Sequence, residues 1–152
     1  MERGPYFDML RRLEKFDGEA EVIEQAKQFT VEILDMNRYD QLYYKGIRSD
    51  DSSLPGYSKN TRFRKNHPEP GRDDRTQNMT LKDYGENYKG LAIKFEQYQF
   101  TIYTKDSKYE MLKEVYGDLI YGLTEENTNE LAEVVKPHLV TAFRKLLLDG
   151  AN

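Results

Sequence analysis

The sequence predicts an α+β domain made of N-terminal helices, a long irregular loop, a small antiparallel β-hairpin and C-terminal helices. Two observations predict this class. Apolar residues recur at three- and four-residue spacing before residue 46 and after residue 124, which is typical of amphipathic helices. Between these regions, residues 91–95 and 100–104 alternate with period two, which is typical of strands. The 152 residues predict a single domain spanning 1–152.

Two helices are expected at the N-terminal side of the chain. The first runs from Pro5 to Phe16, and Asp17-Gly18 ends it. The second runs roughly from Glu19 to Lys45, with Asp17 as its N-cap and Gly46 just past its end. Asn37 is a weak point in its apolar stripe. The apolar faces carry Phe7, Leu10 and Leu13 in the first helix, and Val22, Ile23, Ala26, Phe29, Ile33 and Leu34 in the second.

A long segment, Ser49–Thr80, follows no helix or strand periodicity and is expected to be a loop or arm. Connections longer than about 12–15 residues are usually functional or disordered. Its part from Lys59 to Arg75 has six basic residues against three acidic ones, although the whole chain has a net charge of −4. Three interpretations of this basic loop remain open. It binds nucleic acid, it is a solvated and partly mobile loop, or it docks on a neighbouring subunit.

The loop and the segment after it supply the candidate contact residues. Tyrosine and arginine are enriched at protein interfaces, and an aromatic ring between basic side chains can also stack on a base. The residues expected at an interface or binding surface are Tyr57, Arg62, Phe63, Arg64, Lys65, Arg72, Arg75, Tyr84 and Tyr88.

The strand pair and two further helices complete the expected fold. Residues 91–95 and 100–104 form the hairpin, which needs support from the loop, a partner or the helices because two strands alone are marginal. Gly85, just before it, is expected to adopt a turn conformation that other residues resist. A short helix spans Lys108–Tyr116. Thr124 caps the final helix, which Pro137 should kink or split. The apolar face of that helix carries Leu131, Val135, Leu139, Ala142 and Leu146.

No motif for catalysis, a metal or a cofactor emerges, so a non-enzymatic protein is expected. The chain has no cysteine, which excludes disulfides, thiol catalysis and cysteine-based zinc sites. Its two histidines, His67 and His138, lack a partner at ligand spacing. A hydrolase or nuclease could use only the scattered carboxylates Asp73, Asp74, Asp83 and Glu86. No apolar run reaches the ~18 residues of a membrane span, and the first residues predict no signal peptide.

Four segments of the chain are distinctive: Asp40–Ile47, Gly56–Thr61, Thr80–Tyr88 and Tyr116–Asn127. Together they resemble a family of small proteins encoded in phages and prophages of Bacteroidetes, including crAss-like phages. The Leu-x-Asp-x-Gly-x-x-Tyr pattern of residues 81–88 is also similar to a Leu-x-x-Thr-Gly-x-Leu segment of neck and tail-completion proteins of tailed phages. Tyr84 stands here where that segment has threonine.

The resemblance implies a virion structural protein of the head–tail joint, assembled in the host cytoplasm. Such a neck, connector or tail-completion subunit forms a homo-oligomeric ring and contacts portal or tail proteins. A long loop that reaches a neighbour would suit the repeated heterologous contact of a ring. The alternative is a nucleic-acid-binding phage accessory protein that uses residues 59–75, and for that protein binding should weaken steeply with salt.

Overall fold

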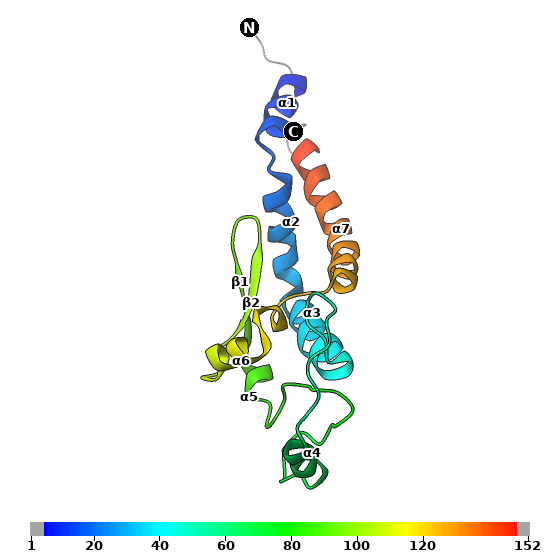
Figure 1. Ribbon diagram of the computed structural model, residues 1–152. Coiled ribbons are helices and arrows are strands. Elements are labelled where there is room, and N and C mark those ends of the chain that lie inside the picture. The colour runs from blue at the N-terminus through cyan, green and yellow to red at the C-terminus, as the bar shows by residue number, and fades with distance from the viewer. Residues whose placement is uncertain (1–4, 149–152) are drawn as a thin grey trace.

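A computed structural model describes residues 5–148 as an elongated α+β molecule, so the predicted fold class is confirmed (Figure 1). A helical pair forms one end of the molecule, and a short helix on a long connection forms the other (Figure 1). In chain order the elements are α1 (Pro5–Lys15), α2 (Gly18–Ala26), the 3₁₀ turn η1 (Lys27–Phe29), α3 (Thr30–Asp35), the π-helix η2 (Met36–Lys45), α4 (Lys59–Asn66), α5 (Glu86–Gly90), β1 (Leu91–Phe95), β2 (Phe100–Thr104), α6 (Tyr109–Tyr116), the 3₁₀ turn η3 (Asp118–Ile120) and α7 (Glu125–Leu148).

The expected long helix is present as the near-continuous run α2–η1–α3–η2. The Asp17 side chain caps its start by accepting a hydrogen bond of 3.1 Å from the Ala20 N–H. Gly46 ends it with a left-handed φ of 64°, as expected for a C′ glycine. The last ten residues form a π-helix, in which Asn37 is fully buried. Its amide donates to the carbonyls of Ile120 and Gly122, so this polar break in the apolar stripe is hydrogen-bonded to the chain ahead of α7.

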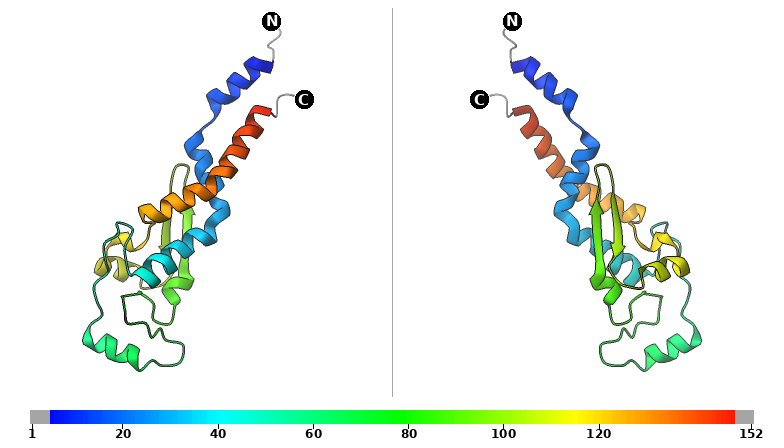
Figure 2. Two further views of the ribbon diagram at one scale, coloured as in Figure 1. Left: turned by 90° about the vertical axis from the view of Figure 1, so that its right-hand side faces the viewer. Right: turned by 90° about the vertical axis from the view of Figure 1, so that its left-hand side faces the viewer.

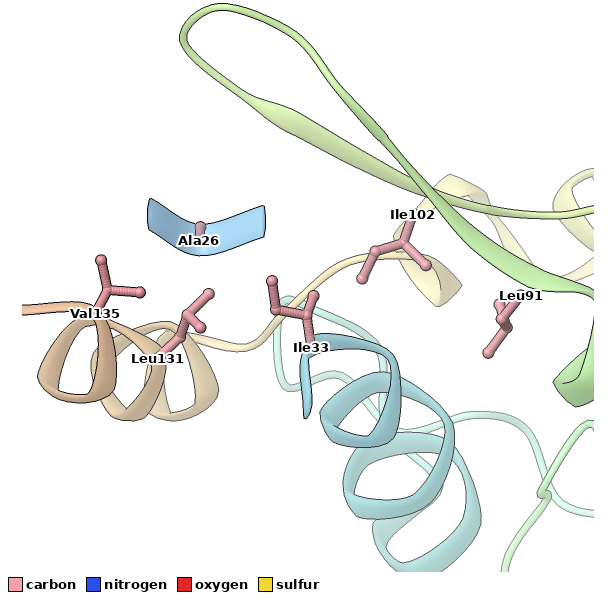
Figure 3. Packing of buried hydrophobic residues seen from close by; sticks show 6 residues of the cluster. All are labelled: Ala26, Ile33, Leu91, Ile102, Leu131 and Val135. Carbon is pink, nitrogen blue, oxygen red and sulfur yellow. The ribbon is translucent and has the colours of Figure 1, made fainter. Parts of the chain in front are cut away.

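The sheet is the expected two-stranded antiparallel hairpin. Leu91 pairs with Thr104 and Ile93 with Ile102. Within residues 5–148 no third strand joins it, and its support comes from helices (Figure 3). One cluster of buried apolar residues joins the long helix, the hairpin and α7, and consists of Ala26, Ile33, Leu91, Ile102, Leu131 and Val135.

A second buried cluster packs both ends of the long connection, residues 49–80, against the rest of the molecule. It consists of Leu42, Leu54, Met79, Tyr88, Leu112 and Ile120. Leu54 and Met79 belong to the segment that the sequence predicts as an irregular loop. That segment therefore folds against its own chain at both ends.

The helical end consists of α1, α2 and the part of α7 after Val135. In this end, α7 lies beside α1 and α2 and contacts both of them (Figure 1). Among the described side chains of this helical end, Ala26 alone is fully buried. Thr124 caps α7 through a hydrogen bond of 3.2 Å from the Asn127 N–H. Pro137 does not split α7, which is one helix that bends along its length (Figure 2).

Candidate interaction site

Residues 49–80 are not irregular throughout, because they contain the eight-residue helix α4. The Ser58 side chain caps α4 by accepting a hydrogen bond of 3.2 Å from the Thr61 N–H. The periodicity of apolar residues gave no sign of this helix, because its only buried residue is Lys65. A helix that packs through a lysine has no apolar stripe to detect.

The inner face of α4 is anchored by a buried ion pair. The Lys65 Nζ lies 2.7 Å from the Asp73 Oδ2, and these side chains are only 7% and 2% exposed. The same ammonium group donates to the backbone carbonyls of Asp73 and Lys82, at 3.2 and 3.3 Å. All three ammonium protons therefore have an acceptor, which fixes the position of α4 relative to the chain that follows it.

Hydroxyl groups complete the surroundings of this ion pair. The Thr80 hydroxyl donates to the Asp73 Oδ2 at 3.0 Å. Because that proton is used, the Tyr57 hydroxyl donates to the Thr80 Oγ1, 3.0 Å away, while accepting from the Thr80 N–H. The Tyr57 ring also lies 4.8 Å from the Lys65 Nζ, as a cation–π contact. Tyr88 donates to the Thr80 carbonyl, and burial raises the pKa of Tyr88 far above its usual value, so it remains a neutral donor.

Two arginines join the connection to the rest of the molecule. Arg72 makes a two-pronged contact with the Asp83 carboxylate, at 2.5 and 3.2 Å, and stacks over the Tyr84 ring. This hydrogen bonding holds the pKa of Asp83 below its ordinary value. Arg75 donates to the Asn78 side chain at 3.0 Å and to the Tyr44 carbonyl at 3.2 Å. Arg72 is therefore paired with a carboxylate, and Arg75 is held by neutral acceptors, inside the chain.

The outer face of α4 presents the remaining candidate residues to solvent. Phe63 is 66% exposed, and Arg62 and Arg64 beside it are exposed as well. Residues two apart lie roughly 200° apart around a helix, so Phe63 points away from the buried Lys65. The Phe63 ring lies 4.6 Å from that of His67, which is also exposed.

The nine candidate residues thus divide into three groups. Lys65 and Tyr88 are buried in their own chain, at 6% and 3% exposure. Tyr57, Arg72 and Arg75 are half-buried, and Tyr84 is 37% exposed and bonded to Glu69. The remaining three form an exposed surface with Phe63 at its centre and Arg62 and Arg64 about 100° to either side of it around the helix, and Arg64 also lines the pocket behind α4. We call this surface the α4 outer face.

A pocket of about 390 Å³ lies behind α4, between it and α6. Its walls mix cations and carboxylates with the apolar side chains of Met79 and Leu112. Two carboxylates that a hydrolase could use are bound to cations, Asp73 to Lys65 and Asp83 to Arg72. Among the residues that the structure describes, no three His, Cys, Asp or Glu side chains gather into a metal site. In the same part of the chain no helix is long and apolar enough to cross a membrane.

The geometry of this region comes from residues that the sequence did not single out for binding. Asp73 and Thr80 position α4, and neither follows a recognisable motif. What they position is an exposed aromatic ring between two guanidinium groups. No protein-family model, curated protein or solved structure matches the chain.

Proposed function

We propose that the protein is a non-enzymatic structural subunit that assembles with copies of itself into a ring at the head–tail joint of a tailed phage. One observation carries the assembly: α4 is fixed by a buried ion pair on one side and exposes Phe63 between two arginines on the other. The place in the virion rests on the resemblance of four segments to phage proteins. In that setting portal or tail proteins are the neighbouring partners.

The energetics of the α4 outer face favour a protein contact. Covering the exposed Phe63 side chain would contribute on the order of 1.5–3 kcal/mol. Aromatic and arginine side chains are also the residue types that dominate the binding energy of interfaces. Because Lys65 and its partners already hold α4 in place, little conformational entropy is lost when the helix binds.

The helical end supports the same reading. A pair of helices offers little volume to bury apolar side chains, and here Tyr6 and Phe7 of α1 remain 62% and 58% exposed. Phe143 and Leu148 of α7 are 38% and 66% exposed. Extended apolar exposure of this kind marks surfaces that are covered by other chains.

Self-assembly is tested by sedimentation velocity over a range of protein concentrations. We expect the wild-type chain to form oligomers as concentration rises, and Phe63→Ala to shift the equilibrium strongly toward monomer. Tyr98→Ala is the matched control, because Tyr98 is another exposed aromatic residue, 54% exposed, at the hairpin turn. A wild-type chain that stays monomeric throughout would contradict assembly through copies of itself.

The phage role is tested by mass spectrometry of purified particles from a phage that encodes the chain. We expect the protein in mature virions at a stoichiometry consistent with a ring. Negative-stain images of the isolated protein should show closed rings. Absence of the protein from mature particles would remove the structural role.

A second candidate function is binding of single-stranded nucleic acid by the same surface. The adjacent rings of Phe63 and His67, between exposed basic side chains, suit base stacking and phosphate contacts. Fluorescence anisotropy with a labelled oligonucleotide should then show binding that weakens steeply with salt. Replacing Arg62 and Arg64 by alanine should lower both the affinity and the salt slope. Unchanged affinity in that variant would exclude this function for α4.

A further inference from the structure

A second surface of the molecule is complementary to the α4 outer face. A groove of about 430 Å³ lies between the run η1–α3–η2 and the first half of α7. Its charged lining residues are all acidic, and no lysine or arginine lines it. The four carboxylates belong to Glu32, Asp35, Asp40 and Glu130. We call it the acidic groove.

Part of this negative charge has no compensating cation. Asp35 pairs with Arg38 at 2.5 Å, and Asp40 pairs with Lys45 at 3.1 Å. Glu32 and Glu130 are exposed, and neither forms an ion pair with any residue from 5 to 148. Two free carboxylates on opposite walls, one from α3 and one from α7, therefore face whatever enters the groove.

Between the carboxylates the groove is apolar and partly open to solvent. Tyr39, Tyr44 and Val134 line it and are 41%, 60% and 41% exposed. Phe29 and Met36 line it as well. An apolar surface with an acidic rim fits an occupant that has an apolar centre and basic flanks, and it disfavours nucleic acid because phosphates would be repelled.

We propose that the acidic groove receives the α4 outer face of a second copy of this chain. Phe63 would lie on the apolar surface of the groove, and Arg62 and Arg64, on either side of it, would approach Glu32 and Glu130. This inference rests on the proposed self-assembly and names the surface that takes part in it. The chain itself supplies the complementary ligand: a fixed, basic helix with an aromatic centre.

The contact forms between copies rather than within one. In all three views of Figures 1 and 2, α4 lies at the end of the molecule away from α7. Its inner face, moreover, is held by Lys65 in its own chain. A contact between two different surfaces is heterologous, and repetition of such a contact closes into a ring or continues as a filament.

Complementary charge reversal tests the pairing directly. The helix variant carries Arg62→Glu and Arg64→Glu, and the groove variant carries Glu32→Lys and Glu130→Lys. By sedimentation velocity, each variant alone should associate at least tenfold more weakly than wild type. Mixed at equal concentration they should associate again, as alternating oligomers of the two variants. In the mixture the basic α4 of the groove variant meets the acidic groove of the helix variant, and the acidic α4 of the helix variant meets the basic groove of the groove variant.

The control variant Glu110→Lys with Glu133→Lys makes the same charge change at two exposed positions outside the groove. It should associate within about twofold of wild type, and circular dichroism and urea titration check that every variant is folded. If the groove variant associates like wild type while Phe63→Ala does not, the groove is the wrong partner and self-assembly through α4 stands. If the mixture associates no more strongly than either variant alone, the pairing is overturned. A wild-type chain that never associates overturns both this inference and self-assembly.

Discussion

The α4 region and the helical end are held in place by different kinds of interaction. Around α4 the buried contacts are polar: an ammonium–carboxylate pair, two hydroxyl groups and backbone carbonyls. At the helical end the contacts are mainly apolar and only half-buried, such as the edge-on contact of Phe16 with Phe143. Hydrogen bonds are directional, whereas apolar contacts are not.

This difference indicates that the α4 outer face is formed before a partner binds, whereas the helical end is not fully packed without one. The ion pair and its hydrogen bonds leave α4 one orientation, so the surface that it shows to a partner exists before binding. The helical end has few fully buried side chains and should gain stability mainly when another chain covers it. Four substitutions follow, and the first three each have a matched comparison in the chain.

The largest expected effect comes from Lys65→Met, which leaves Asp73 buried without a counter-ion. We expect a loss of about 3–5 kcal/mol in the free energy of unfolding, measured by urea titration. Lys59→Met, on the exposed side of the same helix, should change it by less than about 0.5 kcal/mol. The double variant Lys65→Met with Asp73→Leu should regain much of the loss, because no buried charge remains. A small effect of Lys65→Met would mean that the pair does not anchor α4.

The next effect compares the core with the helical end. Ile33 is fully buried between the long helix, the hairpin and α7, so Ile33→Ala should cost about 2–5 kcal/mol. Leu139 lies in the half-buried part of α7, and Leu139→Ala should cost roughly 1 kcal/mol because less apolar surface leaves a buried site. Urea titration of both variants measures this difference. Equal losses would show that the helical end is as well packed as the core.

Replacing Gly46, which lies just before the segment that carries α4, should lower the free energy of unfolding by a smaller amount. Gly46 has a φ of +64°, and a Cβ there would lie 2.7 Å from the Asn78 Nδ2, which donates to the Tyr43 carbonyl. Gly46→Ala should cost roughly 2–3 kcal/mol, from about 1–2 kcal/mol of backbone strain and about 1 kcal/mol of weakened hydrogen bonding. Gly71 also has a positive φ, with nothing near its Cβ position. Gly71→Ala should therefore show the strain alone, and thermal or urea unfolding should separate the two variants.

The smallest effect concerns the part-buried ion pair of Arg72 and Asp83. Arg72 lowers the pKa of Asp83, so this pair stabilises the fold above the unfolded-state pKa of about 4, and the contribution is lost as the pH falls through the lower folded-state value. Asp83→Asn should cost about 0.5–1 kcal/mol at pH 7, since the carboxylate is 47% exposed. The gap between wild type and variant should shrink below about pH 4. A gap that does not depend on pH would assign the effect to packing.

Local signals in the sequence were sufficient for much of the fold. The boundaries of the hairpin, the capping by Asp17 and Thr124 and the helix end at Gly46 were predicted and are confirmed. Gly85, expected in a turn conformation, has a φ of +94°. These features depend on side-chain alternation, on one capping oxygen or on one missing Cβ. Residues close in sequence decide them.

The candidate contact surface was predicted only in part. The sequence pointed to the basic segment and to Arg62, Phe63 and Arg64, which the structure places outward. It also grouped Lys65 and Tyr88 with them, although both are buried. Composition cannot distinguish a cationic side chain that points outward from one that points inward. The orientation depends on whether the fold places a carboxylate next to it, as it places Asp73 next to Lys65.

The sequence by itself determined the N-terminal helices, the hairpin and the final helix, and that positive charge gathers between residues 59 and 75, but it did not show α4 or α5. Only the tertiary structure decided that Lys65 points inward to Asp73 and Phe63 outward, and that carboxylates from α3 and α7 share one groove. The physical reason is the distance along the chain over which each interaction acts. Periodicity and capping act over a few residues, whereas a buried ion pair and a groove need side chains brought together by the packing of distant elements.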